Sequence, residues 1–292
     1  MFDHLKRPVG IGAAMLIACT LACERRDGRG FQALSEADGD SSLLFAEDFE
    51  SGTLVNWSDG VDPARFDVVT DPAVAQSGSR YLAVTYPAGS DGGWLTRFLM
   101  PGYEQLYVSY HVRFPGTWVG GTKLVAVHGS PQEDRWSPFG KAGACPTGLD
   151  FLTAMLVVEP AGSMRFYTYY PAMAREPDGL TCWGRFGDGR EMYRLPLTVS
   201  ADAWHRIELL VSLNAPGQGN ARQTFWIDGV ERGTWSGFSF RDSALLRLTS
   251  VQLTFSVSGG VPRTQQLYVD NLVVRSERPA VSSRRGSDPP GR

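Results

Sequence analysis

The sequence predicts an all-β fold, a two-sheet antiparallel β-jelly roll. Segments of alternating apolar and polar residues, the pattern of half-buried strands, recur along the chain. Gly (33 residues) and Pro (18 residues) are frequent, which is typical of many short strands joined by tight turns. No long segment has the 3.6-residue periodicity of an amphipathic helix, and there is no internal repeat. About a dozen strands without crossover helices pack most simply as two antiparallel sheets.

Residues 1–22 are expected to be a lipoprotein signal peptide. Lys6 and Arg7 precede an apolar run that is too short to span a membrane as a stable helix. Two small-residue–Cys sites follow, and they resemble the lipobox of bacterial lipoproteins, which makes Cys19 or Cys23 the acylated residue. The alternative is an ordinary signal peptide with chance cysteines. If Cys19 or Cys23 is acylated, the protein is expected in the bacterial cell envelope, with the lipid as its only contact with the membrane.

Cysteine parity favours Cys23 as the lipid site, whereas the local motif favours Cys19. A cut before Cys23 leaves only Cys145 and Cys182 in the remainder of the chain, and these two predict a disulfide in an oxidising compartment. The alternative is a pair of unrelated thiols.

The flanks of the expected domain are polar. Residues 23–41 predict a flexible tether, and residues 276–292, rich in Pro, Ser, Arg and Gly, predict a disordered tail. The domain itself is expected to span residues 42–275. The net charge of −3 argues against nucleic acid as a partner, because such proteins carry a basic field.

The first three strands are expected before residue 101. Ser42–Gly52 begins the fold, with Phe49 as a core candidate. Arg80–Pro87 and Trp94–Met100 follow on either side of the turn Gly89–Gly93.

The next two strands are predicted at Leu106–Phe114 and Thr122–His128, separated by a turn rich in Pro and Gly. In the first of them one face is apolar and the other carries Tyr107, Ser109, His111 and Arg113. That polar face either binds a polar ligand or simply meets water. His128, at a strand end, is expected to be structural.

Leu149–Pro160 is almost continuously apolar and predicts a central strand. Met164–Pro171 returns antiparallel to it and places Arg165, Tyr167 and Tyr169 on one face. Long loops precede and follow this pair of strands. They contain the two cysteines, together with Trp136 and Trp183, and a disulfide between them would stiffen the rim of a cleft.

The last five strands are expected where alternating apolar patterns recur beyond residue 203. An Asp-Gly turn joins the second of them to the third. Their ranges are Trp204–Asn214, Thr224–Gly229, Val230–Trp235, Leu246–Val257 and Gln266–Arg275.

From about Phe49 to Val274 the chain resembles the concanavalin A-like jelly rolls and, among them, the family 14 polysaccharide lyases, which include alginate and glucuronan lyases. The resemblance lies in short motifs, namely Tyr110–Pro115, Gly120–Leu124, Tyr167–Tyr169, Val211–Gly217, Trp226–Gly229, Gly259–Gly260 and Asp270.

The resemblance implies catalytic roles for Lys123, Tyr167 and Tyr169. Thr122 is an insertion before that lysine relative to the family's Gly-Gly-Lys-Leu motif. The segment Phe151–Leu156 has no Arg where the family pattern has one.

The chemistry implied is β-elimination at an acidic, uronate-containing polysaccharide. Such a lyase neutralises a carboxylate, removes the neighbouring C5 proton and protonates the leaving oxygen. His111, Arg113, Arg165 and Trp118 are the expected substrate-binding residues, with the first two beside the tyrosines on one concave face. The alternative is a non-catalytic carbohydrate-binding or envelope-structural lipoprotein, so whether the protein is an enzyme stays open at this point.

No cofactor is required for this chemistry. In many jelly rolls an early acidic residue and an Asp on the last strand bind a structural Ca²⁺, and Glu47, Asp48 and Asp270 are the corresponding candidates. Glycoside hydrolysis is less favoured, because neither carboxylate spacing of the hydrolase branch occurs on an expected strand.

Overall fold

The computed structural model describes residues 41–160, 163–183 and 200–280. Within these ranges the chain forms strands and no helix, and no helix long and apolar enough to cross a membrane is found there. The strands are β1 (Leu43–Glu47), β2 (Phe66–Thr70), β3 (Arg80–Tyr86), β4 (Trp94–Tyr103), β5 (Gln105–Arg113), β6 (Thr122–Pro131), β7 (Leu152–Val158), β8 (Met164–Tyr169), β9 (Trp204–Ser212), β10 (Ala221–Ile227), β11 (Val230–Phe238), β12 (Leu246–Thr254) and β13 (Gln265–Arg275).

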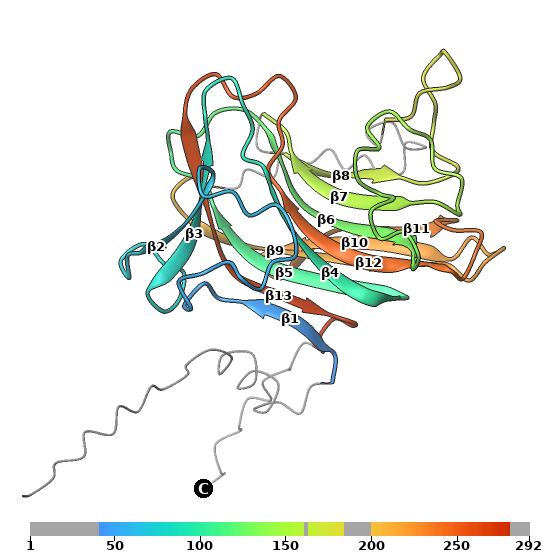
Figure 1. The fold of residues 1–292 in the computed structure, drawn as a ribbon, viewed down its shortest axis with the longest axis horizontal. Helices are drawn as coiled ribbons and strands as arrows, with labels where there is room; N and C mark the ends of the chain where they lie inside the picture. Colours follow the sequence, from blue (N-terminus) through green and yellow to red (C-terminus); the bar gives the residue numbers. More distant parts are fainter. Residues whose placement is uncertain (1–40, 161–162, 184–199, 281–292) are drawn as a thin grey trace, which may run out of the picture.

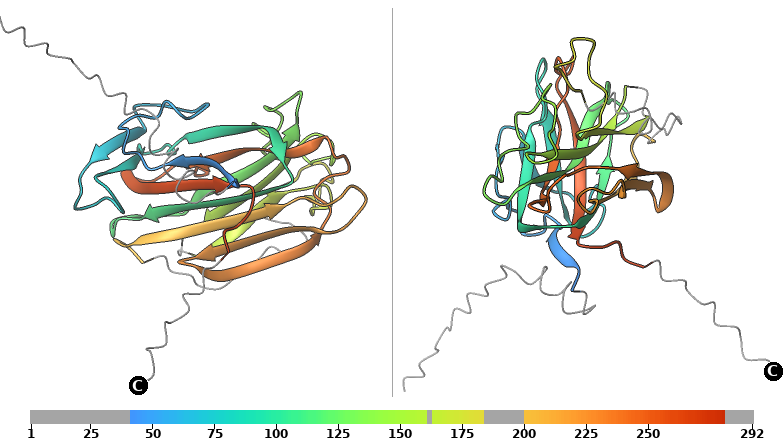
Figure 2. Two further views of the ribbon diagram at one scale, coloured as in Figure 1. Left: turned by 90° about the horizontal axis from the view of Figure 1, so that it is seen from below. Right: turned by 90° about the vertical axis from the view of Figure 1, so that its right-hand side faces the viewer.

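Two antiparallel sheets form the predicted jelly roll (Figure 1). One sheet has eight strands in the order β11-β10-β9-β5-β13-β3-β2, with β1 also paired to β13. The other has five strands in the order β4-β12-β6-β7-β8. The two curved layers lie face to face (Figure 2). The all-β, two-sheet antiparallel prediction is therefore confirmed.

The core lies between the sheets and is filled by the apolar face of each alternating strand. In β5, Leu106, Val108, Tyr110 and Val112 are almost fully buried, as the alternation predicted. All seven residues of β7 are buried, which agrees with its continuous apolar run. Tyr86 of the large sheet reaches across the core, where its hydroxyl is hydrogen-bonded to that of Thr122 at 2.8 Å.

The two ends of the described chain lie together, because β1 pairs with β13 and Ser276 donates its N–H to the Ser42 carbonyl. Residues 276–280 of the expected tail are described, and the Arg278 guanidinium lies 4.1 Å from the centre of the Trp226 ring. The signal peptide, Cys19, Cys23, nearly all of the tether and residues 281–292 lie outside the described residues.

One strand, β2, was missed by the sequence analysis. It contains only Phe66, Val68 and Val69 as apolar residues and lies at the edge of the large sheet. A five-residue segment with one fully buried side chain carries little periodic signal.

Candidate active site

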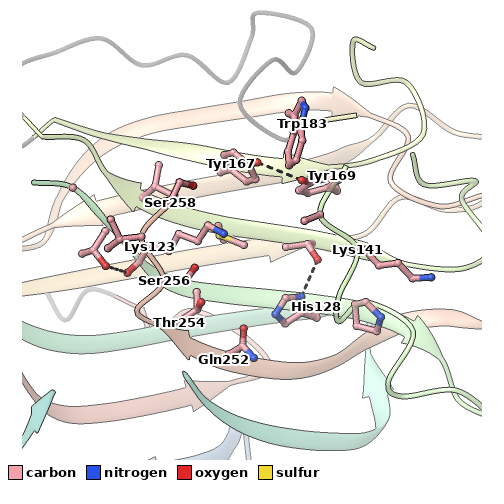
Figure 3. A pocket seen from close by; sticks show the side chains of 18 of the residues that line it. Lys123, His128, Lys141, Tyr167, Tyr169, Trp183, Gln252, Thr254, Ser256 and Ser258 are labelled. Atoms are coloured by element: carbon pink, nitrogen blue, oxygen red, sulfur yellow. Dashed lines mark hydrogen bonds between the residues drawn. The ribbon is translucent and has the colours of Figure 1, made fainter. Parts of the chain in front are cut away.

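A groove of about 820 Å³ runs over the outer face of the five-stranded sheet (Figure 3). Its floor is formed by outward-facing side chains of β6, β7, β8 and β12, and two loops that precede and follow the β7–β8 hairpin form one rim. Lys123, Tyr167 and Tyr169, the three residues with expected catalytic roles, all line it. The structure therefore brings together the three residues to which the resemblance assigns catalytic roles, and the roles themselves stay predictions.

A β-bulge in β6 determines which way Lys123 points. Lys123 pairs with Val157 and Ala126 with Met155, so two residues of β6 stand opposite one residue of β7. Leu124 and Val125 both point into the core, and the outward alternation restarts at Ala126. Without the extra residue, Lys123 and His128 would face opposite sides of the sheet.

The insertion before Lys123 has a structural role. Thr122 is buried, and its hydroxyl is hydrogen-bonded to that of Tyr86 on the opposite sheet. The contact fastens the start of β6 to the core, and the next residue therefore projects outward into the groove.

Strands β7 and β8 place three pairs of side chains on the groove face. In the antiparallel register these pairs are Thr153 with Tyr169, Met155 with Tyr167, and Val157 with Arg165. The hydroxyls of Tyr167 and Tyr169 are hydrogen-bonded at 3.3 Å, and their ring centres are 5.6 Å apart. The two phenols therefore present a joint polar edge to the groove (Figure 3).

Lys123 lies beside this pair. Its Nζ is 5.7 Å from the centre of the Tyr167 ring. Burial lowers the pKa of Lys123 from its usual value of 10.5, and the carboxylate of Asp91 opposes that shift only partly. No carboxylate within salt-bridge distance of this lysine is found in the described part of the chain.

The groove carries an excess of positive charge. Its lining includes Lys123, Lys141 and Arg165, and Glu159 is its one carboxylate among the described residues. Glu159 already accepts a hydrogen bond from Arg165 at 2.6 Å, so that pair is internally neutralised. Lys123 and Lys141 form no salt bridge with any described residue, and their ammonium groups favour an anionic ligand.

Buried polar side chains form the floor between the lysines. His128 is hydrogen-bonded through Nδ1 to the Thr153 hydroxyl at 2.9 Å. Gln252 donates to Thr96 on the neighbouring strand at 2.9 Å. Burial lowers the pKa of His128 to about 4, so the imidazole is neutral at physiological pH. The sequence analysis had expected this histidine to be structural, but it also lines the groove.

The expected placement of His111 and Arg113 beside the tyrosines is wrong. Both lie on β5 of the eight-stranded sheet, on its outer face, so the whole sandwich separates them from the groove. His111 pairs across strands with Arg206 and Asp270, and burial lowers its pKa. Alternation assigned both residues correctly to the outer face of their strand, but it does not reveal to which sheet a strand belongs.

Trp118 also lies outside the groove. Its indole packs edge-on against Tyr86 and Phe114, its N–H donates to the Gly120 carbonyl, and it borders a separate hollow of about 300 Å³. The expected role of Trp118 in substrate binding is therefore not supported by its position. Arg165, by contrast, does line the groove.

The three carboxylates considered for Ca²⁺ each accept backbone hydrogen bonds. Glu47 accepts the N–H of Phe49, Asp48 that of Glu50, and Asp270 those of Gln76, Ser77 and Asn271. Within the described ranges, no group of three His, Cys, Asp or Glu residues is placed to hold a metal ion. Glu47, Asp48 and Asp270 are thus not grouped as a three-carboxylate site among the described residues, and the Ca²⁺ site stays a prediction.

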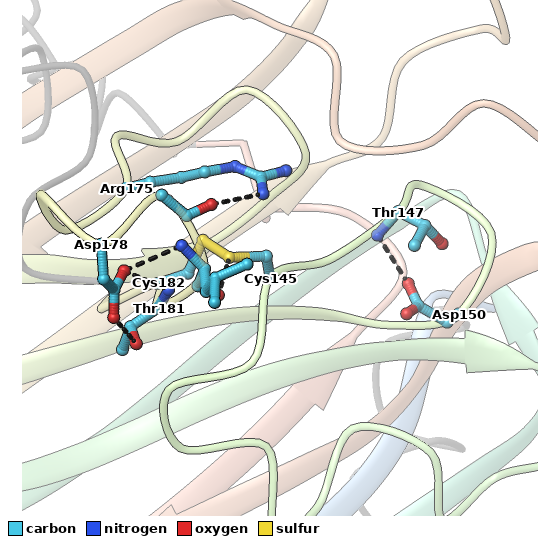
Figure 4. The surroundings of a disulfide bond; sticks show 9 residues. Cys145, Thr147, Asp150, Arg175, Asp178, Thr181 and Cys182 are labelled. Atoms are coloured by element: carbon cyan, nitrogen blue, oxygen red, sulfur yellow. Dashed lines mark hydrogen bonds between the residues drawn. A yellow bond between two sulfur atoms is a disulfide. The ribbon is translucent and has the colours of Figure 1, made fainter.

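The rim of the groove is stapled by the disulfide Cys145–Cys182, the pair predicted from cysteine parity (Figure 4). The bond joins the loop before β7 to the loop after β8. Trp183, which follows Cys182 directly, lies over the groove near the tyrosines (Figure 3). Lys141, Met155, Gln252 and Thr153 are groove residues that the sequence analysis did not single out.

The sequence of the chain matches a known protein family. The family model for polysaccharide lyase 14 matches residues 75–263. That range contains every groove residue described above. No curated protein matches the chain in sequence.

Three solved structures illustrate the likeness in fold. Alginate lyase vAL-1 from Chlorella virus is similar with a TM-score of 0.60 and 16% identity, over 80% of this chain and 99% of that one. An endo-β-1,4-glucuronan lyase from the fungus Trichoderma reesei gives 0.54 and 16%, over 80% and 95%. A marine alginate lyase from Aplysia kurodai gives 0.55 and 16%, over 80% and 99%. At these identities the likeness establishes a shared fold.

Proposed function

The chain belongs to the polysaccharide lyase 14 family, and from this premise we propose that it cleaves an acidic, uronate-containing polysaccharide by β-elimination in the groove of the five-stranded sheet. The observation that carries the proposal is the convergence of Lys123, Tyr167 and Tyr169 in one positively charged groove. The names of the structural neighbours, alginate and glucuronan lyases, agree with an acidic substrate.

The reaction divides into a proton transfer and a bond cleavage. A base removes the proton from C5 of a uronate, beside its carboxylate, and the electron pair of that C–H bond becomes the C4=C5 double bond. The bond from C4 to the glycosidic oxygen breaks, and that oxygen leaves with its electron pair and takes up a proton from an acid. No water is consumed and no oxidant is needed.

Lys123 is the group that we assign to the substrate carboxylate. Lys123 is half-buried and forms no salt bridge among the described residues, so its ammonium can neutralise the uronate and make the C5 proton more acidic. A charge partly shielded from water acts more strongly than a fully exposed one. His128 and Gln252, on the floor beside it, supply neutral hydrogen-bonding groups for the same carboxylate.

The tyrosine pair is assigned to the proton transfers. A phenolate is the form of a tyrosine that accepts a proton, and the Lys123 ammonium, 5.7 Å from the centre of the Tyr167 ring, is a nearby cation that can balance its charge. The two hydroxyls are hydrogen-bonded to each other, so a proton taken up by one phenol can be passed to its neighbour. The pair can therefore act first as base and then as acid.

The same proposal places the protein in the bacterial cell envelope, held by a lipid on Cys19 or Cys23. It rests on the signal-like segment before residue 23 and on the disulfide, which suits an oxidising compartment. A lyase held at the envelope would act on polysaccharide that reaches the cell surface or the periplasm.

The test is a spectroscopic assay of the purified protein on alginate, glucuronan, pectate and glycosaminoglycans. The unsaturated product of elimination absorbs at about 235 nm, so we expect the absorbance to rise on at least one uronate polymer. Lys123→Ala and Tyr169→Phe should each slow the rise by about 100-fold or more. His111→Gln, on the opposite sheet, is the matched control and should leave the rate unchanged.

A flat trace on every polymer would contradict the proposed lysis. If the protein cleaved no polymer but one glycan still retarded it on an affinity gel, a non-catalytic carbohydrate-binding role would replace the proposed lyase activity. Met155, which stands on the strand where the family pattern has an Arg, is the feature that favours this second role.

A further inference from the structure

Lysine is rare in this chain, and its positions are selective. Only three of the 28 Lys and Arg residues are lysines, namely Lys6, Lys123 and Lys141. The two that belong to the folded domain both line the groove. Elsewhere the domain uses arginine for its surface charge, so the use of lysine at these two positions calls for an explanation of its own.

The two lysines stand at the ends of a row of aromatic rings. Lys123 Nζ lies 5.7 Å from the Tyr167 ring centre, and the Tyr167 and Tyr169 ring centres are 5.6 Å apart. The row continues to Phe151, 6.2 Å from Tyr169, and Lys141 Nζ lies 5.7 Å from the Phe151 ring centre. The ammonium groups thus flank the tyrosine pair on either side (Figure 3).

Lys141 has no salt bridge within the described chain, although the rim loops around it contain several carboxylates. Asp178 is occupied by the Thr181 hydroxyl and backbone, and Asp150 by the N–H groups of Thr147 and Phe151 (Figure 4). Asp150 and Asp178 are therefore engaged within the loops, and the Lys141 ammonium, which forms no salt bridge with a described residue, is available to a ligand.

The disulfide holds Lys141 and Trp183 in one unit. Cys182 donates its N–H to the Gly143 carbonyl at 3.0 Å, and Ala144 closes a turn onto the Lys141 carbonyl. A side chain at Gly143 would touch the Trp183 indole at 3.6 Å, so the ring already rests against this backbone. With Cys145–Cys182 closing the unit covalently, the cation and the indole are held at the same end of the groove.

We propose that Lys141, positioned with Trp183 by the Cys145–Cys182 bond, forms a second carboxylate subsite for the same substrate chain. The inference rests on the proposed function. Lys123 takes the carboxylate of the reacting uronate, and Lys141 takes that of another uronate beyond the tyrosines. Trp183 offers an amphipathic face to the intervening sugar. The substrate class is thereby narrowed to polymers that present at least two uronates within one groove.

The choice of lysine fits this role. An ammonium is a compact charge on a flexible stem with three donors, so it can follow a carboxylate that is carried at varying heights along a sugar chain. Arginine demands a planar, two-point partner. The Phe151 ring, whose centre lies 5.7 Å from Lys141 Nζ, is an uncharged neighbour and leaves the charge of the ammonium unneutralised.

The kinetic test compares Lys141→Gln with Arg175→Gln, which removes the same charge from the same disulfide-tied rim but outside the groove. On the best uronate polymer, Lys141→Gln should raise KM about tenfold and change kcat less than about twofold. Arg175→Gln should change neither. The double variant Cys145→Ser/Cys182→Ser should raise KM similarly, and adding Lys141→Gln to it should have little further effect.

A binding test does not depend on turnover. In the Tyr169→Phe background, titration calorimetry with a saturated tetra-uronate should show Lys141→Gln weakening Kd about tenfold, and the fully methyl-esterified tetra-uronate should show no such difference. An unchanged KM and Kd in Lys141→Gln would overturn the subsite, as would a loss confined to kcat. If no polymer is cleaved, the proposed function fails, and the calorimetry still decides whether Lys141 binds a carboxylate.

Discussion

Lys123 is the residue on which the proposed chemistry depends most. It is held outward by the bulge that follows it and by the Thr122–Tyr86 hydrogen bond that precedes it. Burial lowers its pKa, and no salt bridge within the described residues compensates its charge. A protein keeps such a group at a cost in stability, and this cost is explained if the ammonium neutralises a bound carboxylate.

The pH profile should report this lysine. Lys123 must be protonated to neutralise the substrate, so activity is present below its pKa and is lost as pH rises through it. Because that pKa is lowered from 10.5, the alkaline limb of kcat/KM should fall earlier than for an exposed lysine. Lys123→Arg should cost about 100-fold in activity and move the limb upward, since arginine stays charged. If kcat/KM of Lys123→Arg fell at the same alkaline pH as that of the wild type, the fall would belong to a group other than Lys123.

Some of the site could be predicted residue by residue. Tyr167 and Tyr169 share a face because residues two apart on a regular strand do, and the resemblance around Lys123 implied a catalytic role beside them. His111 and Arg113 could not be placed, because their outward alternation is the same whichever sheet contains β5. Lys141 could have been singled out from the sequence, because lysine is scarce in a chain that is rich in arginine.

At the scale of elements, two features depend on how strands pair and could not be predicted from the sequence pattern, namely the edge strand β2 and the bulge in β6. The strands with strong alternation were all predicted, whereas the short edge strand β2 was not. The bulge in β6 was also invisible, since Leu124 and Val125 both point into the core and break the expected alternation. A bulge depends on the pairing of two strands, so one strand's pattern does not reveal it.

Strand β1 ends at Glu47, a titratable residue that should make the stability of the fold depend on pH. Glu47 is buried and accepts the Phe49 N–H, and desolvation raises its pKa to about 7. An acid with a raised folded pKa stabilises the fold fully below its unfolded value of 4.5, and that contribution is lost as pH rises through 7. Glu47→Gln should therefore gain stability relative to wild type, by up to about 3 kcal/mol, between pH 5 and 8, as measured by urea unfolding.

Glu50, three residues further along, provides the opposite control. Its carboxylate accepts hydrogen bonds from the N–H groups of Ser79 and Arg80, and its pKa is lowered. Glu50→Gln should lose stability above the usual carboxyl pKa and lose little at low pH. A Glu47→Gln difference that did not change between pH 5 and 8 would contradict the assignment of a buried, protonated carboxyl.

At the scale of the molecule, the two outer faces of the sandwich differ in character. The face of the five-stranded sheet is hollowed into a groove whose lysines form no salt bridge among the described residues. On the opposite face Glu208 is contacted by Arg206, Arg278 and the Tyr107 hydroxyl. This asymmetry favours a single anionic ligand site on the groove side. The fold class was predictable from periodicity, but which face is hollow depends on the rim loops and on their disulfide.

The measurement that tests the central claim most directly is the mass of the products formed from a defined oligouronate. Elimination predicts that the masses of the two fragments add up to that of the substrate, with the new non-reducing end unsaturated. Lys123→Ala should slow the appearance of both fragments by about 100-fold or more. Fragments that together gain one water would show hydrolysis instead. That result, or undiminished cleavage by Lys123→Ala, would contradict the account.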